Sequence, residues 1–175
     1  MNMTFAKVRP TVAPTKGTPG SAGLDIYIPN FTKEYIKDYG EQNYRKLDYN
    51  GIQATRIDTF DHEIILSPKT AIVIPIGLKF NIPKGYGLFA FNKSGVVIKQ
   101  TVIKLAEVID HDYQGEVFVS IWNYGEEFIR IKENQKIIQL VLLEVPEYTL
   151  QEVEELDLYT SNSIRGNGAM GSTGL

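Results

Sequence analysis

The sequence predicts an all-β fold of the sandwich or barrel class. Short segments rich in β-branched and aromatic residues recur at close spacing, Pro or Gly separates most of them, and helical patterns are scarce. A doubly wound α/β sheet would need helices between its strands, so the pattern argues against that class. The length of 175 residues predicts one domain, residues 1–175, with a sizeable core.

The first half of the chain contains short strand-like segments separated by turn residues. Thr4–Val8 alternates in character, and Pro10–Gly23, rich in Pro and Gly, is predicted to be a loop. Leu24–Ile28 is the second expected strand. The following segments are also short, β-branched or aromatic, and bounded by Pro or Gly: Ile64–Leu66, Ala71–Ile74, Gly77–Ile82 and Gly87–Phe91.

The second half continues the same pattern. Val102–Ile109 and Glu116–Trp122 are expected strands on either side of a turn at Asp112–Gly115. Strict alternation within Glu116–Trp122 predicts that one of its faces is buried. Phe128–Ile131 and Ile137–Val145 complete the expected strands.

One segment, Asn30–Glu63, interrupts the strand pattern. Tyr35, Ile36 and Tyr39 fall on one helical face, which predicts a short helix within a charged excursion from the sheet. Two interpretations are open for this insertion. It is either a surface decoration or an interaction surface for a neighbouring subunit or another protein.

Composition excludes several classes of function. The net charge of −3 gives no broad basic surface, so no nucleic-acid partner is expected. No apolar run has membrane-spanning length, and the first residues lack a signal-peptide pattern. The absence of cysteine excludes disulfides and thiolate metal sites and fits the reducing cytoplasm, where we expect the protein. With only two histidines, an imidazole metal site is not expected.

A carboxylate at the end of an apolar strand is the candidate catalytic group. Asp110 ends the segment Val102–Ile109 and precedes a turn that contains Tyr113 and Gly115. An acid at a strand end can be held rigidly, as a general base requires. The alternative is that Asp110 merely begins the turn, a role that Asp112 also suits.

Two further segments carry groups that suit phosphate. Lys93, Ser94 and Gly95 combine a cation, a hydroxyl and an unhindered backbone N–H after a strand. Gln139 places a polar amide in a strongly apolar strand, where it either faces inward toward a partner or points to solvent.

The segment Arg165–Leu175 is rich in glycine and has one charged residue. Such a composition cannot form a core, so we expect residues 162–175 to be mobile until a ligand orders them. Its backbone N–H groups, hydroxyls and guanidinium suit a phosphate chain. The alternative is an ordinary frayed terminus.

These segments, in this order, resemble the motifs of the homotrimeric dUTPase family. The resemblance covers all of the chain except Asn30–Glu63. The segments that carry it are Ser21–Ile26, Lys93–Gly95, Val108–Gly115, Gln139 and Arg165–Gly174.

The resemblance implies a jelly-roll-like β-barrel that forms a homotrimer, with active sites between subunits that hydrolyse dUTP to dUMP and pyrophosphate. Asp110 is implied to activate the attacking water, Tyr113 to pack under the deoxyribose, and Asp25 to support the site. Mg²⁺ is the implied cofactor, held mainly by substrate phosphates and water. The other implied contacts are Lys93, Ser94, Gly95 and Gln139 to the phosphates, Ala106, Glu107, Val108 and Ile109 to the base, and Arg165, Met170, Gly171, Ser172 and Thr173 from the closing tail.

Some positions depart from the family pattern. Lys93 replaces the usual arginine, Met170 replaces a stacking aromatic residue, and Leu105 and Glu107 stand where small residues are common. Asn134–Lys136 replaces a Gly-Asp-Arg-like run. A pyrophosphatase for a modified deoxyuridine triphosphate and an enzyme of the dCTP-deaminase branch are therefore alternatives. A third alternative, from another class, is a regulatory or protein-binding module that acts through residues 30–63.

Overall fold

The computed structural model describes residues 2–43, 55–58, 61–161, 163, 164, 166 and 168, with the backbone alone for 39–43 and 55–58. Its strands are β1 Thr4–Lys7, β2 Leu24–Tyr27, β3 Thr55–Asp58, β4 Glu63–Leu66, β5 Ala71–Pro75, β6 Leu78–Asn81, β7 Tyr86–Asn92, β8 Val102–Lys104, β9 Val108–Ile109, β10 Phe118–Asn123, β11 Ile129–Lys132 and β12 Lys136–Glu144. Its helices are α1 Lys33–Asn43, α2 Ser94–Gln100 and the 3₁₀ turn η1 Glu155–Asp157.

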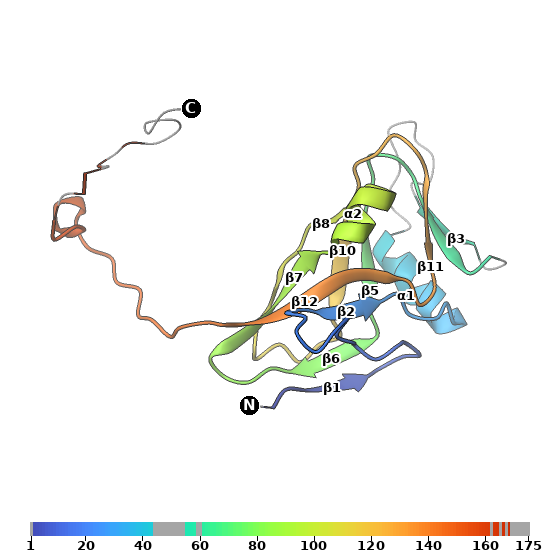
Figure 1. Cartoon of the computed structure of the whole chain (residues 1–175), viewed down its shortest axis with the longest axis horizontal. Coiled ribbons are helices and arrows are strands. Elements are labelled where there is room, and N and C mark those ends of the chain that lie inside the picture. Colours follow the sequence, from blue (N-terminus) through green and yellow to red (C-terminus); the bar gives the residue numbers. More distant parts are fainter. Residues whose placement is uncertain are drawn as a thin grey trace.

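The strands pair antiparallel in small sheets that wrap around one core (Figure 1). Within the described residues, the strand orders are β1-β6, β5-β10-β8, β11-β4-β3 and β2-β12-β7-β9. Residues that are far apart in the sequence become neighbours in these ladders, as when Gln139 of β12 pairs with Phe91 of β7 and Asp25 of β2. The all-β class predicted from the sequence is confirmed.

Alternating side chains from these strands fill the core. In β10, Val119 and Ile121 are buried while Phe118 is exposed, as the strict alternation of this segment predicts. The core members are mainly Ile, Leu and Val, which suit a half-buried pleated surface. The fully buried ones include Ile26, Ile28, Ile64, Leu66, Ile72, Ile74, Ile76, Leu78, Leu88, Ile121 and Leu140.

The predicted helix of the 30–63 segment is present as α1, which packs against β5. The Thr32 hydroxyl accepts a hydrogen bond from the Tyr35 backbone N–H at 3.1 Å, so Thr32 caps the helix. Tyr35 is fully buried, and its ring lies against buried Phe31 with ring centroids 5.3 Å apart. The start of this segment therefore belongs to the core and is more than a surface decoration. The Tyr39 side chain, the third member of the predicted helical face, lies outside the described residues.

Two features differ from the strand prediction. Residues 94–100 form α2, which was not predicted because a run of β-branched residues gives little helical signal. The expected strand Val102–Ile109 is divided into β8 and β9. Leu105 donates its backbone N–H to Ser120 on β10 (2.8 Å), whereas Glu107 accepts from Ala90 on β7 (2.7 Å). The chain is interrupted between β8 and β9 because it passes from one sheet to the other.

The segment after β12 leaves the body of the molecule (Figure 1). Large apolar side chains on it, such as Tyr148, Leu150 and Tyr159, are exposed. Among the described helices, none is long and apolar enough to cross a membrane.

Candidate active site

Asp110 lies at the start of a tight loop that joins β9 to the segment before β10. The backbone N–H of Tyr113 donates to the Asp110 carbonyl at 3.2 Å, which closes the turn. Asp110 is exposed, and no described residue hydrogen-bonds to its carboxylate or forms an ion pair with it. Its carboxylate is therefore accessible to a ligand from outside this part of the chain.

Tyr113 is held both by its side-chain hydroxyl and by its backbone N–H. Its hydroxyl donates to the Glu116 backbone carbonyl at 2.7 Å, in addition to the backbone bond to Asp110. The ring covers Gly115 closely, because a Cβ on Gly115 would lie 2.3 Å from the Tyr113 hydroxyl oxygen and 2.5 Å from Cζ. This approach explains the glycine, since any side chain there would displace the ring.

The loop borders a cavity of about 200 Å³ that Asp110 and Tyr113 line together with Val108, Ile109, Val117 and Phe118. A smaller hollow of about 30 Å³ adjoins it and is lined in part by Ala106, Glu107, Val108 and Ile109. The predicted base-reading residues thus lie next to the predicted catalytic residue. A larger cavity of about 350 Å³ lies between the β1–β6 pair and residues 111–114, and Asp110 does not line it.

An ion pair between Lys104 and the predicted base-reading segment Ala106–Ile109 was not anticipated from the sequence. Lys104 Nζ contacts the Glu107 carboxylate, and the Lys104 side chain is almost completely buried. Burial lowers the pKa of Lys104. The i,i+3 spacing on a strand-turn segment carries no clear signal for such a pair. The ion pair holds the Glu107 carboxylate against Lys104, at the end of β8.

A second cluster lies on the β2-β12-β7-β9 sheet and centres on Asp25. The buried Asp25 carboxylate accepts from Lys93 Nζ at 2.8 Å and lies 2.7 Å from Lys136 Nζ. Burial by itself raises the pKa of Asp25, but the hydrogen bonds and charges of Lys136 and Lys93 outweigh this effect and hold the pKa below its usual value. The same carboxylate raises the pKa of Lys136. Asp25 thereby orients both lysines.

Gln139 lies beside this cluster. Its side-chain amide donates to the Asn92 carbonyl at 3.1 Å, next to Lys93. Gly23 packs against the Gln139 side chain so closely that a Cβ there would lie 2.8 Å from Gln139 Oε1. Gln139 is half-buried and has partners, so it neither points fully inward nor projects freely into solvent. Ser94 and Gly95, at the start of α2, are exposed nearby.

The two clusters lie at different ends of β7. Ile109 pairs with Leu88, and Asp110 follows it directly, whereas Lys93 comes five residues beyond Leu88. Asp110 therefore lies opposite Gly87, six residues from Lys93, and at roughly 3.3 Å per residue the separation along the strand is about 20 Å. The structure thus groups Asp25, Lys93 and Gln139 in one cluster and Asp110, Tyr113 and the predicted base-reading segment Ala106–Ile109 in another.

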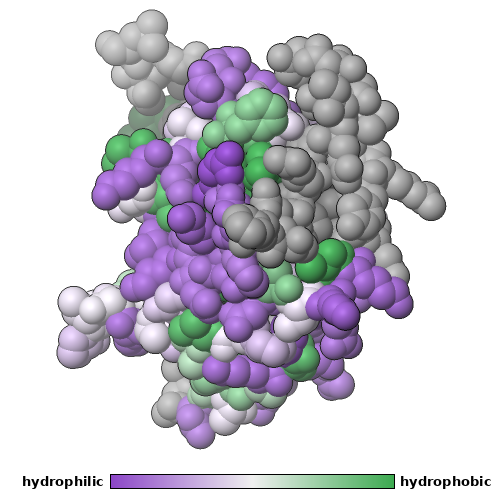
Figure 2. Space-filling view, turned by 90° about the vertical axis from the view of Figure 1, so that its right-hand side faces the viewer, coloured by the Kyte–Doolittle hydropathy of each residue, from purple (hydrophilic) through white to green (hydrophobic). Residues whose placement is uncertain are grey.

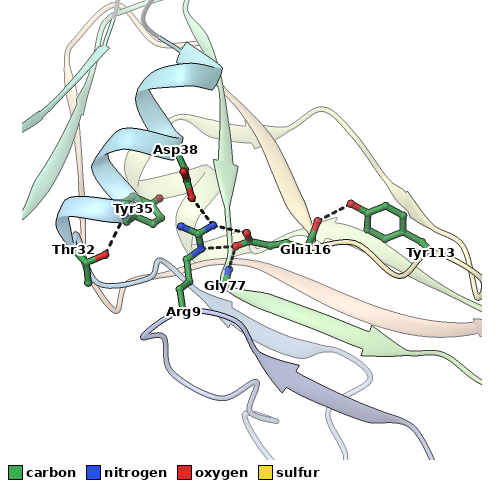
Figure 3. A network of polar contacts seen from close by, with 7 residues as sticks. All are labelled: Arg9, Thr32, Tyr35, Asp38, Gly77, Tyr113 and Glu116. Carbon is green, nitrogen blue, oxygen red and sulfur yellow. Dashed lines mark hydrogen bonds and ion pairs between the residues drawn. The ribbon is translucent and has the colours of Figure 1, made fainter.

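Figure 3 shows a polar network that sequence reasoning missed. The Arg9 guanidinium donates two hydrogen bonds to the Glu116 carboxylate, from Nε at 2.7 Å and from Nη2 at 2.5 Å. Glu116 directly follows the Tyr113–Gly115 turn. The two residues are 107 positions apart in the chain, so no local pattern could have identified the pair.

The predicted tail residues Arg165, Met170, Gly171, Ser172 and Thr173 lie outside the described residues. Among the residues that the structure does describe, no group of three or more His, Cys, Asp or Glu side chains is arranged to hold a metal ion. That Mg²⁺ is held mainly by substrate phosphates and water stays a prediction.

The antiparallel sheets around one core define the class of a jelly-roll-like β protein, which carries a carboxylate–tyrosine loop and a separate lysine–glutamine cluster. Comparison with known proteins specifies the family. A family model described as dUTPase matches residues 60–174. The chain therefore belongs to the dUTPase family.

Curated relatives agree with this assignment. The deoxyuridine 5'-triphosphate nucleotidohydrolase of Polynucleobacter necessarius subsp. necessarius is 31% identical over 165 residues, which cover 92% of this chain and 87% of the relative. The enzyme of the same name from Caulobacter vibrioides (strain NA1000 / CB15N) is 37% identical over 117 residues, which cover 66% of this chain and 73% of the relative.

Solved structures confirm the dUTPase-like, jelly-roll β fold. The Staphylococcus bacteriophage 80alpha dUTPase with dUPNHPP superposes with a TM-score of 0.72 at 21% identity and covers 99% of both chains. The dUTPase from phage phi11 of S. aureus superposes with a TM-score of 0.65 at 18% identity, covering 91% of this chain and 100% of that one.

Proposed function

We propose that this protein hydrolyses dUTP to dUMP and pyrophosphate. Membership of the dUTPase family and relatives named as deoxyuridine 5'-triphosphate nucleotidohydrolases support this substrate. The observation that carries the proposal is the exposed Asp110 carboxylate beside Tyr113 at a cavity of about 200 Å³. A cytoplasmic location, expected from the lack of cysteine, suits a nucleotide substrate.

Asp110 acts as the general base in this scheme. Its carboxylate takes a proton from a water molecule, whose oxygen forms a bond to the α-phosphorus while the bond from that phosphorus to the bridging oxygen breaks. Pyrophosphate leaves and dUMP remains. The support is that Asp110 has no partner among the described residues, so it is available to orient water.

The phosphate chain binds to the second cluster. Lys93, Ser94, Gly95 and Gln139 contact the phosphates, and Asp25 holds Lys93 in place. Phosphoryl transfer depends mainly on positioning and charge neutralisation, which these groups provide. Mg²⁺, bound through phosphate oxygens and water, would neutralise charge on the phosphates when present. Arg165, Met170 and Gly171–Thr173 close over the nucleotide from the tail.

The separation of the two clusters supports an oligomer with shared sites. Asp110 and Lys93 of one chain lie about 20 Å apart along β7. A single nucleotide can contact both an Asp110 and a Lys93 more easily when Asp110 comes from one copy of the chain and Lys93 from another. We propose a homotrimer, the assembly implied by the family resemblance, with active sites between subunits.

The segment Ala106–Ile109 reads the base. Its Glu107 carboxylate is attached to Lys104, a departure from the small residues common in the family, so a modified deoxyuridine triphosphate is the second candidate substrate. The test is a turnover assay that measures pyrophosphate and ammonia release from dUTP, dCTP and the other deoxynucleoside triphosphates, with and without Mg²⁺. Pyrophosphate from dUTP is expected. Ammonia from dCTP would indicate a deaminase instead.

A protein partner at the 30–63 segment is the second candidate function. Tyr35 anchors α1 in the core while Lys33, Glu34 and Lys37 are exposed, so a partner can bind without disturbing the fold. Among the residues coloured in Figure 2, those on the side of the molecule where α1 and β11 lie are mainly hydrophilic, which suits a polar, reversible contact. Capture of a partner that is lost on substitution of these charged residues would support it.

A further inference from the structure

We propose that Arg9, Glu116 and Asp38 form a positioning network that holds Tyr113 in place and links helix α1 to the catalytic loop. The proposal rests on the proposed function, in which Tyr113 packs under the deoxyribose. It assigns a role to residues that contact neither Asp110 nor the cavity that Asp110 lines.

The centre of the network is the Glu116 carboxylate, which accepts three hydrogen bonds. Arg9 donates from Nε and Nη2 to the two Glu116 oxygens, and the Gly77 backbone N–H donates to Glu116 Oε1 at 2.8 Å. The Arg9 and Glu116 side chains are each only 13% exposed. A shielded fork of this kind restrains both partners far more than a surface ion pair does.

Gly77 shows how closely this centre is packed. Its φ is +75°, and a Cβ there would lie 2.7 Å from Arg9 Cγ. The backbone turn before β6 therefore accommodates the Arg9 side chain only because residue 77 is glycine.

The network continues into α1. Arg9 Nη2 lies 3.0 Å from Asp38 Oδ2, and the guanidinium carbon lies 5.7 Å from the centroid of the buried Tyr35 ring. The hydrogen bonds from Arg9 to Glu116 and Asp38, together with these charges, outweigh burial and raise the pKa of Arg9. Arg9 therefore remains charged. Asp38 and Tyr35 of α1 lie against its guanidinium.

On its other side the network reaches the loop. The Glu116 backbone carbonyl accepts from the Tyr113 hydroxyl, and the Tyr113 N–H donates to the Asp110 carbonyl (Figure 3 shows the path as far as Tyr113). A continuous set of polar contacts thus runs from Asp38 through Arg9, Glu116 and Tyr113 to Asp110. Loosening it will move Tyr113 first, and the expected consequence is weaker discrimination between deoxyribose and ribose.

The experiment compares kcat and KM for dUTP and UTP in Arg9→Met, Arg9→Lys and Asp38→Asn. We expect Arg9→Met to reduce the ratio of kcat/KM for dUTP to that for UTP about tenfold, because small misplacements of a positioning group are costly. Arg9→Lys should recover part of the ratio, since lysine keeps the charge but not the fork. Asp38→Asn should reduce the ratio about threefold, because Asp38 makes one partly exposed contact.

Arg130→Met is the matched control. Arg130 pairs with the buried Glu63 across β11 and β4, and neither residue lines the cavity at Asp110. This variant should lower the melting temperature without changing the dUTP/UTP ratio. If Arg9→Met also lowers only stability, or lowers activity on both nucleotides equally, the network is merely structural and the proposal is wrong.

Coupling to Tyr113 gives the second test. Tyr113→Phe removes the hydroxyl that bonds to Glu116, so Arg9→Met added to Tyr113→Phe should change the ratio much less than Arg9→Met alone. Additive effects would overturn the proposed path. If the wild-type protein does not turn over dUTP, the proposed function fails, and the ratio is then measured as relative affinity for the non-hydrolysable imido analogues of dUTP and UTP.

Discussion

Two aspartates that the sequence singled out occupy opposite environments. Asp110 is exposed at the start of a loop and has no described side-chain partner. Asp25 is buried and contacts two lysines. The comparison separates two uses of a carboxylate. A paired, desolvated acid orients its neighbours and is unavailable for proton transfer, whereas an exposed acid held only through its backbone can bind water and substrate.

The largest expected effect concerns Asp110 itself. Asp110→Asn should reduce kcat for dUTP about 10³-fold, because the loss of a general base costs 10² to 10⁴ in rate. Nucleotide binding, measured by calorimetry, should persist. Asp112→Asn is the matched control, since Asp112 lies two residues away in the same exposed turn and should keep most of its activity. Normal turnover by Asp110→Asn would remove this residue from the base role.

Removal of the tail should have the next largest effect. Deleting Arg165–Leu175 is expected to lower kcat about 10²-fold, as loss of transition-state donors does. The melting temperature should hardly change, because no described core residue lies beyond Leu142. Unchanged steady-state kinetics in the truncated protein would contradict the proposal that the tail closes over the nucleotide. The proposed active site would then consist of Asp110, its loop and the phosphate-binding cluster alone.

Gly115→Ala sharpens the comparison by disturbing the Asp110 loop alone. The new methyl group would overlap the Tyr113 ring, so the ring must move and its bond to Glu116 must break. We expect kcat/KM for dUTP to fall about tenfold, with a smaller change for UTP. Gly20→Ala is the control, because a Cβ at Gly20 meets nothing within 4 Å. Equal kinetics for the two variants would show that the Tyr113 position is unimportant.

Asp25→Asn should act mainly on stability. The folded-state pKa of Asp25 is below its usual value of 3.8, so the ionised form stabilises the fold above that pH and loses this contribution as the pH falls through the lower, folded-state pKa. At neutral pH the variant should lose about 1.5–3 kcal/mol in denaturant unfolding, the range for hydrogen bonds to charged groups.

The difference between wild type and Asp25→Asn should shrink as the pH decreases below about 4, where Asp25 of the unfolded chain begins to be protonated while Asp25 of the folded chain is still ionised. Glu126→Gln is the control, since Glu126 pairs with Lys69 in a largely exposed contact that contributes little. A difference that is constant down to the acid limit would mean that the charge of Asp25 is not what stabilises this cluster.

Local pattern was a good guide where the structure follows local rules. The alternation in residues 116–122 predicted that Val119 and Ile121 share one face of β10, which the structure buries, and the spacing of Tyr35 and Ile36 predicted α1. It failed for α2, whose β-branched residues carry little helical propensity. It also failed at residues 105–107, where the chain changes sheets and the strand is interrupted for a reason that no local window contains.

Residue chemistry and order alone identified the loop that begins at Asp110, the lysine at position 93 and the glutamine at 139, because each is a polar group at a strand boundary or within an apolar strand. Their grouping was decided only by the tertiary structure. Asp25 and Lys93 are 68 residues apart and Arg9 and Glu116 are 107 apart, and they meet because strand pairing brings distant segments together. Charge pairs of this kind depend on distance and shielding from water, which exist only once the chain has folded.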